Sequence, residues 1–300
     1  MIPSNPIAQI YDECARNVVD CVVHGQNGTI FAYGPSGAGK TYTMQGTASH
    51  NPDERGIMQR AAEHIFRAMG EQKAKLGSDF DFTLRCSYVE LHNERFYDLL
   101  RTENPVHLRP TANTPLQNAT VTVCTTVGDV VRLIELGAKN RRVAETLNNR
   151  HSSRSHAIFT VQLETIAQQA DNKQLNRMAL LNLVDLAGAE QVADSARYHF
   201  QRRLRETCSI NNSLSVLSRV VRALADGKPH VPYRESKLTL LLQPSLGGDA
   251  HTCFVVNLAA DQRNKTIVKR CLQFAQSVMQ VSNAPQIHEQ ICEKQTSLRK

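Results

Sequence analysis

GTIFAYGPSGAGKT, residues 28–41, decides the fold of this chain. Its first half contains a short apolar run, Thr29–Tyr33, of the kind that forms a buried strand. Its second half follows the pattern G-x-x-x-x-G-K-[S/T], in which glycines let successive backbone N–H groups turn towards phosphate oxygens. A helix that starts directly after such a loop adds a favourable dipole. The predicted phosphate-binding residues are Gly34, Pro35, Ser36, Gly37, Ala38, Gly39, Lys40 and Thr41.

Two side chains of this loop have a predicted role of their own. Lys40 can reach the outer phosphates of a nucleotide, and Thr41 can ligate magnesium through its hydroxyl. The motif requires a strand before it and a helix after it. We therefore predict a strand over Thr29–Tyr33 and a helix that begins where the loop ends.

Strand-like runs alternate with helical stretches along the rest of the chain. Helical spacing of apolar residues predicts helices in ERGIMQRAAEHIFRAM, VGDVVRLIELGAKN and SINNSLSVLSRVVRAL, with Asp129 as the N-cap of the second and Gly137 near its end. FTLRCSYVELHN, TVTVC, HAIFTVQLETI, MALLNLVDLAG and TCFVVNLAA are predicted strands, and MALLNLVDLAG has the continuous apolar character of a buried central strand. The pattern predicts an α/β fold: a large, mixed, mostly parallel central sheet with helices on both faces.

Composition and charge narrow the class of protein. The 35 Lys and Arg exceed the 28 Asp and Glu by seven, an excess that favours an acidic partner without choosing among nucleic acid, anionic lipid and acidic protein surfaces. No apolar run reaches membrane-spanning length, and the first residues lack the layout of a secretory signal, so a cytosolic location is expected. The eight cysteines include no C-x-x-C pair, which favours buried reduced thiols over a zinc site.

Two further motifs carry chemistry, but each is a weak signal alone. NNRHSSRSH, residues 148–156, is by itself typical of a solvated loop or a phosphorylation target. DLAGAE, residues 185–190, follows the buried strand LLNLV. An Asp at the end of such a strand can hold a magnesium-bound water, and a Gly just beyond it can offer its N–H to a terminal phosphate.

In this order, the phosphate loop, N-x-x-S-S-R-S-H and D-L-A-G-x-E resemble the kinesin motor domain. The resemblance includes framework stretches such as SYVELHNERFYDLL, SINNSLSVLSRVVRAL and VPYRESKLTLLLQPSLGG, and it extends from Asn5 to Ala284. It implies a P-loop NTPase of kinesin motor architecture over residues 1–284, followed by a neck or linker-like tail over 285–300. For that tail, a frayed terminal helix is favoured over the start of a coiled coil.

The resemblance implies a role for residues of the first switch. Kinesins hydrolyse ATP with Mg²⁺ and use it to move along or remodel microtubules. Asn149 and Ser152 would belong to this switch, and Ser152 would help to position the attacking water. Ser153 would join Thr41 in ligating magnesium.

The second switch would supply the remaining catalytic groups. Asp185 would reach the metal through water, and Gly188 would sense the γ-phosphate through its backbone. Glu190 would pair with Arg154 and so close the site behind the phosphate. These roles fit a reaction that depends on positioning and on charge neutralisation.

The stretches after the second switch would form the face that binds the track. Tubulin is acidic, and Arg234 and Lys237 are the residues expected to contact it. Asn212 and Leu240 replace residues that are usually basic in the family, and Pro244 should end its helix early because proline lacks an N–H donor. The implied partner is the microtubule, in the cytoplasm, with neither nucleic acid nor membrane, and a dimer could form through coiled-coil regions absent from this sequence.

The first residues depart most from the family. A kinesin motor domain normally begins with a strand that carries Arg-x-Arg-Pro and packs against the adenine, and this sequence has no such segment. In the family that strand lies beside the one resembling TCFVVNLAA. We therefore expect an N-terminally truncated domain, without its adenine wall, and an exposed apolar edge over Cys253–Leu258.

Three functions are weighed on these grounds. The first is an ATP-driven microtubule motor domain. The second is a kinesin-fold microtubule-binding module with impaired ATP hydrolysis, which the missing adenine wall and the fewer track-side cations favour. The third is another P-loop NTPase, such as a GTPase or a helicase. It is disfavoured because Asn172-Lys173 and Asn264-Lys265 lack the Asp of Asn-Lys-x-Asp, and because no aromatic and basic residues interleave as in a single-strand channel.

Overall fold

The computed structural model describes residues 6–47, 51–103, 105–108, 116–148, 152–169, 173–190, 202–258 and 265–293. The strands are β1 (Asn27–Tyr33), β2 (Phe80–His92), β3 (Arg95–Asp98), β4 (Pro105–Leu108), β5 (Leu116–Gln117), β6 (Thr122–Cys124), β7 (His156–Gln168), β8 (Lys173–Asp185), β9 (Ala250–Val256) and β10 (Glu289–Glu293). The helices are α1 (Pro6–Ile10), α2 (Arg16–Val23), α3 (Lys40–Gln45), α4 (Ile57–Leu76), α5 (Val127–Asn148), α7 (Arg202–Ala225), α8 (Lys237–Leu241) and α9 (Lys265–Val278).

One sheet runs through the molecule in the order β5-β4-β3-β2-β7-β8-β1-β9, with β6 paired to β2 and β10 paired to β8. It is mixed, as predicted. The prediction that it is mostly parallel is wrong: among the described strands, only β1 pairs in parallel, with β8 and with β9. The long β7–β8 hairpin is antiparallel because a short connection between adjacent strands reverses the chain. The β2–β7 pair is antiparallel as well, although β3 to α5 lie between these two strands in the sequence.

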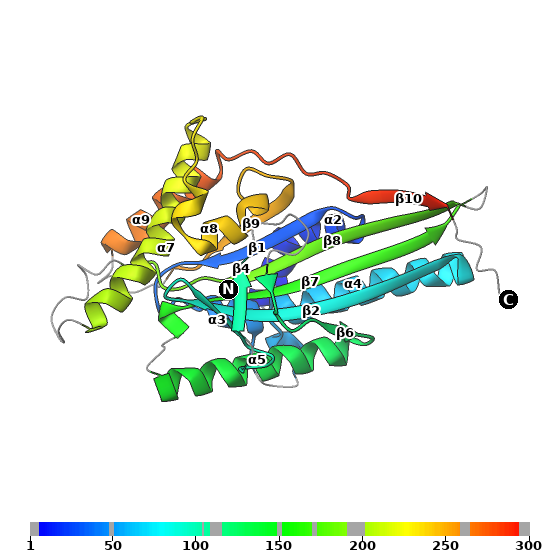
Figure 1. Cartoon of the computed structure of the whole chain (residues 1–300), viewed down its shortest axis with the longest axis horizontal. Coiled ribbons are helices and arrows are strands. Elements are labelled where there is room, and N and C mark those ends of the chain that lie inside the picture. The colour runs from blue at the N-terminus through cyan, green and yellow to red at the C-terminus, as the bar shows by residue number, and fades with distance from the viewer. Residues whose placement is uncertain are drawn as a thin grey trace.

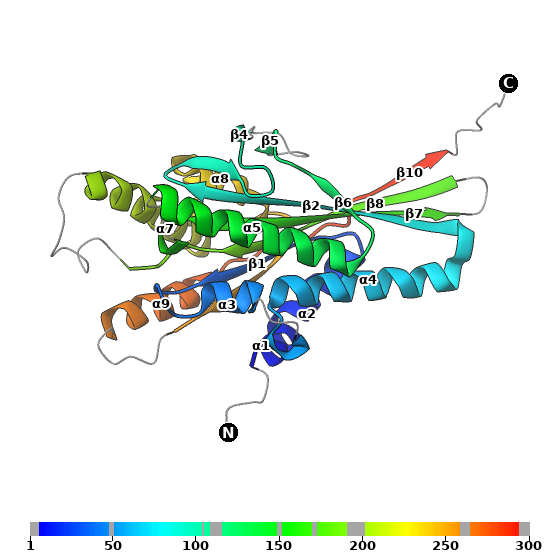
Figure 2. The ribbon, with the colours of Figure 1, turned by 90° about the horizontal axis from the view of Figure 1, so that it is seen from below.

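Helices cover both faces of the sheet, as the alternating and apolar strand patterns predicted. Successive side chains of β1 show this division. Ile30 and Ala32 pack with α2, α4 and α5 in one core, whereas Phe31 and Tyr33 pack with α7, α8 and α9 in the other. In Figure 1, α7 and α9 lie at one end of the strands and α4 and α5 run along the other side of the sheet. Figure 2 shows β7 and β8 side by side and α4 extending with them.

The three predicted helices form, as α4, α5 and α7, and each is longer than the predicted stretch. Helix α5 ends at Asn148, so Gly137 lies in its middle, and a Cβ there would be 2.1 Å from Cδ1 of Tyr88. Asp129 lies inside the first turn, where its carboxylate accepts hydrogen bonds from the N–H groups of Thr125 and Thr126. The glycine is there because the helix packs closely on a tyrosine, a tertiary contact that the local pattern does not report.

The tail forms a strand where a frayed helix was predicted. Residues 289–293 pair antiparallel with residues 173–177 of β8. Strand β1 pairs only with residues 181–185 of β8, so it leaves this earlier part of the same edge open. Asn283 holds the preceding segment, since its side-chain amide donates to the carbonyls of Ser245 (3.1 Å) and Ala250 (2.6 Å). Ile291 is 60% exposed, so the apolar spacing of the tail does not mark a buried helical face.

The open end of the sheet lies where it was predicted. Among the described strands, β9 is the last on its side, and it pairs only with β1. Phe254 of this strand stacks on Phe31, with ring centroids 4.3 Å apart. Pro244 falls in a short 3-10 turn after α8, which ends at Leu241, in agreement with its predicted effect. None of the helices in the described part of the chain combines the length and apolar character needed to cross a bilayer.

Candidate nucleotide-binding site

The phosphate loop connects β1 to α3, as the motif requires, at the carboxyl end of β1, which lies between β8 and β9. Gly34 begins the loop with φ of 151°, and a Cβ there would lie 2.1 Å from the carbonyl oxygen of Asn257. The backbone N–H of Asn257 in turn donates to the carbonyl of Tyr33 at 2.7 Å. Only glycine allows the loop to approach β9 this closely.

Lys40, the first residue of α3, holds the loop from within. Its Nζ donates to the carbonyl oxygens of Gly34 (3.0 Å) and Pro35 (2.9 Å), and the residue is only 7% exposed. Burial lowers the pKa of Lys40, while the negative charges of Asp185 and Glu190 oppose that shift. The ammonium group is therefore already positioned inside the loop that would surround the phosphates.

The predicted metal ligands Thr41 and Asp185 meet at the carboxyl end of β8. Thr41 Oγ1 donates to Asp185 Oδ2 at 2.8 Å, and Asp185 is 1% exposed. Asp185 Oδ1 is buried, and among the described residues nothing donates a hydrogen bond to it. A buried carboxylate oxygen without a donor needs a cation or an ordered water. Mg²⁺ is commonly held through one or two carboxylates together with substrate phosphates, so these residues fit that ion.

Arg141 is a member of this cluster that the sequence reasoning missed. It extends from α5, and its Nη1 donates to Asp185 Oδ2 at 2.7 Å while its Nη2 donates to the carbonyl of Ser155 at 3.0 Å. Its Nε lies 3.7 Å from Oε1 of the buried Glu90. Arg141 is one of several basic residues in its helix, and no local pattern separates it from the exposed Arg142.

The two predicted switches lie beside each other at the loop. The N–H of Gly188 donates to the carbonyl of Ser153 at 2.9 Å, and the N–H of Ala189 donates to the carbonyl of Gly34 at 3.0 Å. Ser153 is therefore close to the second switch through its backbone. Its predicted role as a magnesium ligand, and the phosphate contact predicted for Gly188, stay predictions.

Glu190 is bound by Ser36. The Ser36 N–H donates to Glu190 Oε2 at 2.9 Å, and the Ser36 hydroxyl donates to Oε1. Among the residues that the structure describes, no ion pair joins Glu190 to Arg154, so that predicted pair stays a prediction. Asn149 lies outside the described residues, and of Ser152 only the backbone, in the turn Ser152–Arg154, is described.

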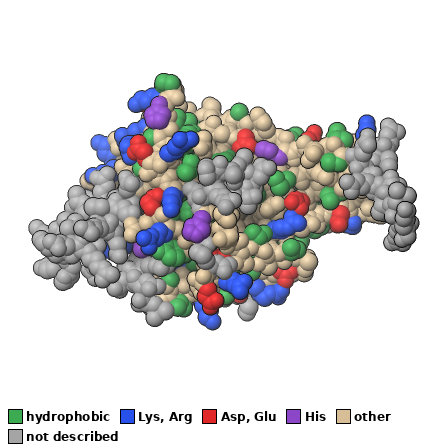
Figure 3. Space-filling view, viewed as in Figure 1, with side chains coloured by type: hydrophobic (Ala, Val, Ile, Leu, Met, Phe, Trp, Pro, Cys, Tyr) green, Lys and Arg blue, Asp and Glu red, His purple; other side chains and the backbone are tan. Residues whose placement is uncertain are grey.

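The predicted track residues lie together on an exposed segment. Arg234 is part of the turn Tyr233–Glu235, Lys237 begins α8, and both are exposed. Glu94 fixes this segment, because its carboxylate accepts hydrogen bonds from the Lys237 N–H (2.6 Å) and from the Ser236 hydroxyl (3.0 Å). Figure 3 shows Lys and Arg side chains gathered over the end of the molecule formed by α7 and α8.

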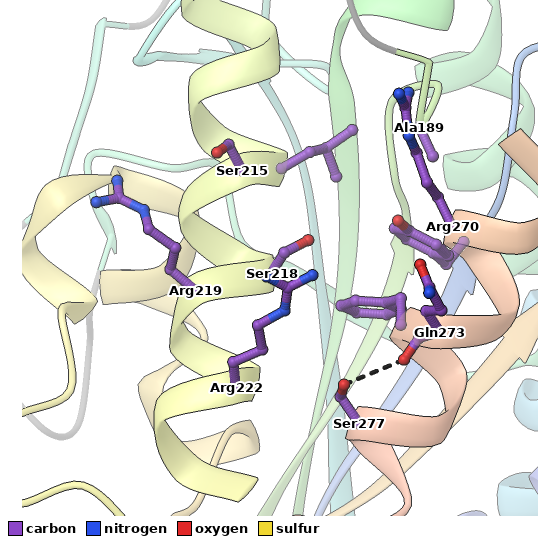
Figure 4. Close-up of a pocket in the computed structure, with 11 residues that line it drawn as sticks. Ala189, Ser215, Ser218, Arg219, Arg222, Arg270, Gln273 and Ser277 are labelled. Carbon is purple, nitrogen blue, oxygen red and sulfur yellow. Dashed lines mark hydrogen bonds between the residues drawn. The ribbon is translucent and has the colours of Figure 1, made fainter. Parts of the chain in front are cut away.

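A groove of about 200 Å³ separates α7 from α9 near this basic end. Figure 4 shows Arg222 and Ser218 on the α7 wall and Arg270 and Gln273 on the α9 wall. Arg219 points away from α9 in the same view, and it forms an ion pair with Glu235 at 2.5 Å. The groove therefore adds positive charge to the surface that carries the predicted track residues.

Comparisons with known proteins agree with this geometry. A profile of the kinesin motor domain family matches residues 3–281. The human Kinesin-like protein KIF15 is 40% identical over 294 residues and the mouse Kinesin-like protein KIF15 is 39% identical over 293 residues, each alignment covering 93% of this chain. The chain spans about a fifth of the length of these relatives (21%). A solved structure described as "Structure of a fast kinesin: Implications for ATPase mechanism and interactions with microtubules" superposes with a TM-score of 0.85 at 34% identity, covering 98% of this chain and 80% of that one.

Proposed function

Since the chain belongs to the kinesin motor domain family, we propose that it is an ATP-driven microtubule motor domain. It hydrolyses ATP with Mg²⁺ and couples hydrolysis to movement along microtubules or to their remodelling. Kinesin motor domains are generally ATPases, and proteins of the family are associated with the cytoskeleton. The chain acts in the cytoplasm, on microtubules.

The observation that carries this proposal is the contact between the phosphate loop and the second switch. Thr41 and Asp185 come from α3 and β8, far apart in the sequence, and their side chains are hydrogen bonded at 2.8 Å beside a buried Lys40. Phosphoryl transfer needs this arrangement, because catalysis depends on a metal, a cation and backbone N–H groups placed around the transferred phosphate.

The exposed Arg234 and Lys237 support the second half of the proposal. They lie on the turn and the first residue of α8, at the end of the molecule where basic side chains gather. A cationic surface attracts an acidic filament over distances comparable to the Debye length, so it raises the rate of encounter and the affinity at low salt. We assign microtubule binding to this surface.

Lys40→Ala tests the nucleotide half of the proposal. Wild-type protein is expected to release phosphate from ATP faster when microtubules are added. Lys40→Ala should lower that turnover by about 100-fold or more, because no other described cation reaches the same position inside the loop. Lys75→Ala, an exposed lysine in the last turn of α4, is the matched control and should leave turnover unchanged. Equal turnover in Lys40→Ala and wild type would remove the loop from the mechanism.

A kinesin-fold microtubule-binding module with impaired hydrolysis is the second candidate. It is favoured by the contact of Glu190 with Ser36, which leaves the predicted Arg154 pair unformed in this structure. Co-sedimentation with microtubules measured beside ATP turnover separates the two functions. Binding without stimulated turnover would support the module, and binding with stimulated turnover supports the motor domain.

A further inference from the structure

His156 connects the two switches to the helix next to the basic surface. It is the last residue of the motif NNRHSSRSH and the first residue of β7, and it is 2% exposed. Its Nδ1 lies 3.1 Å from the backbone N of Ala187 in the second switch, and its Nε2 lies 2.8 Å from Oγ of Ser213 on α7. Ala187 and Ser213 are themselves buried, at 0% and 3% exposure.

The chemistry of the ring gives these two contacts a direction. A backbone N–H can only donate, so Nδ1 of His156 must accept from Ala187 and carry no proton. Burial, helped by the positive charges of Arg141 and Lys40 and by His92, lowers the pKa of His156 to about 3, so the ring is neutral. In a neutral imidazole with a free Nδ1, the proton is on Nε2, which donates to the Ser213 hydroxyl.

Neighbouring bonds tie the same segments together at other points, but they do not reach α7. Gly188 N–H donates to the carbonyl of Ser153, which joins the second switch to the first. Arg141 donates to the carbonyl and hydroxyl of Ser155, which joins the first switch to α5. Within the described part of these segments, the hydrogen bonds of His156 connect the two switches to α7.

We propose that His156 is a positioning residue that transmits the position of the second switch, next to the nucleotide phosphates, to α7 on the track side. The proposal rests on the proposed function of a microtubule-stimulated ATPase. A displacement of Ala187 changes the bond to Nδ1, and a rigid ring passes this change to Nε2 and hence to Ser213. A buried hydrogen bond that is lost at either end leaves an unsatisfied polar group, so the three segments favour one common arrangement.

Two variants remove the α7 half of the connection from opposite sides. His156→Asn places an acceptor oxygen where Nδ1 was, which preserves the bond from Ala187, and has no group at the position of Nε2. Ser213→Ala removes the partner hydroxyl and leaves the histidine. Ser245→Ala is the matched control, because Ser245 is a buried serine (2% exposed) whose hydroxyl bonds Thr29 at 2.6 Å, away from both switches.

Steady-state turnover is the first readout. His156→Asn and Ser213→Ala should keep basal ATP turnover and ADP affinity within about twofold of wild type, while stimulation by microtubules falls about five- to tenfold, the size of a typical coupling between sites. The double variant should be no worse than either single variant, since both remove the same bond. Unchanged stimulation in both single variants would overturn the proposal, and so would an equal fall in basal turnover, which indicates a merely structural role.

Hydrogen exchange is the second readout, and it needs no microtubules. In wild-type protein, adding ATP and Mg²⁺ should change the exchange of α7 peptides and of phosphate-loop peptides. In His156→Asn the change in α7 should be lost while the change in the loop remains; if α7 responds as in wild type, the proposal fails. If the wild type binds nucleotide and α7 responds, but microtubules do not stimulate turnover, the proposed function fails and the connection through His156 stands.

Discussion

Arg154 and Glu190 are opposite charges on the two predicted switches. Glu190 is held by the backbone and hydroxyl of Ser36. We predict that Arg154 and Glu190 pair during the reaction, at a partly desolvated site where an unpaired charge costs more than at an exposed one. The double variant Arg154→Ala/Glu190→Ala should then lose less turnover than the sum of the two single losses, expressed as free energies.

The control for this cycle is Lys75→Ala, which changes an exposed lysine in the last turn of α4 and leaves both switches in place. Combined with Arg154→Ala, it should give losses that add, because Lys75 shares no described partner with Arg154 or Glu190. Strict additivity of the Arg154 and Glu190 variants would show that the two residues do not interact during turnover.

His156 should make the folded state sensitive to acid. Burial, and next the charge of Arg141, keep its pKa at about 3 in the folded chain, whereas a histidine in an unfolded chain titrates near about 6.5. Between these values the unfolded chain binds a proton that the folded chain does not, so the free energy of unfolding falls as the pH is lowered.

Urea unfolding of wild type and His156→Gln over this range measures the effect. The wild type should lose about 1.6 kcal/mol more stability than the variant between pH of about 6.5 and 5, because the unfolded histidine goes from half to nearly full protonation over that interval. Carboxylates titrate in both proteins and cancel in the difference. Parallel curves for the two proteins would show that His156 can accept a proton in the folded state.

At the scale of one element, α5 depends on a glycine in its middle. A Cβ at Gly137 would be 2.1 Å from Tyr88 Cδ1. The Tyr88 ring cannot retreat easily, because it is fully buried, packs edge-on against Phe159 and accepts a hydrogen bond from Gln45. We expect Gly137→Ala to lower the free energy of unfolding by about 1–3 kcal/mol, a loss larger than the gain in helix propensity.

Gly70→Ala in α4 is the matched experiment. This glycine is exposed, and nothing lies within 4 Å of an added Cβ. The substitution should stabilise the protein by about 0.5–1 kcal/mol, because alanine loses less conformational freedom in a helix than glycine does. Denaturant midpoints of both variants measure the contrast. Stabilisation by both would mean that α5 can shift away from Tyr88 at little cost.

At the scale of the whole molecule, β9 is the last of the described strands on its side of the sheet. The N–H of Asn257 donates to β1 through Tyr33, and backbone donors alternate along a strand, so the N–H of Val255 also faces β1 and that of Val256 faces the open edge. An apolar strand with unpaired donors is a template for another strand. We predict that the chain self-associates at this edge as its concentration rises.

Gel filtration over a range of concentrations tests this edge with two proline variants. Val256→Pro should shift the protein towards the monomer, because it removes a donor that faces the open edge. Val255→Pro removes a donor that faces β1, so it should lower stability without specifically preventing association. A wild-type chain that stays monomeric at every concentration would show that this edge is protected.

The sequence by itself determined the local chemistry and the class of fold. Glycine spacing, with a strand before it and a helix after it, predicted the phosphate loop, which the structure confirms from β1 to α3. Apolar periodicity predicted the helices α4, α5 and α7 and the strands β1, β2, β6, β7, β8 and β9, because burial repeats with the period of each element. It did not predict strand β10 in the tail. The order of three motifs identified the family, which the match over residues 3–281 shows.

Only the tertiary structure decided which groups meet. Periodicity reports that a strand is buried but not which strand pairs with it, so the antiparallel majority of the sheet and the pairing of β10 with β8 could not be predicted. Arg141 reaches Asp185, and His156 reaches Ser213, across distances in the sequence at which no local pattern exists. Hydrogen bonds and ion pairs of this kind depend on atoms within about 3 Å of each other, and folding alone brings those atoms together.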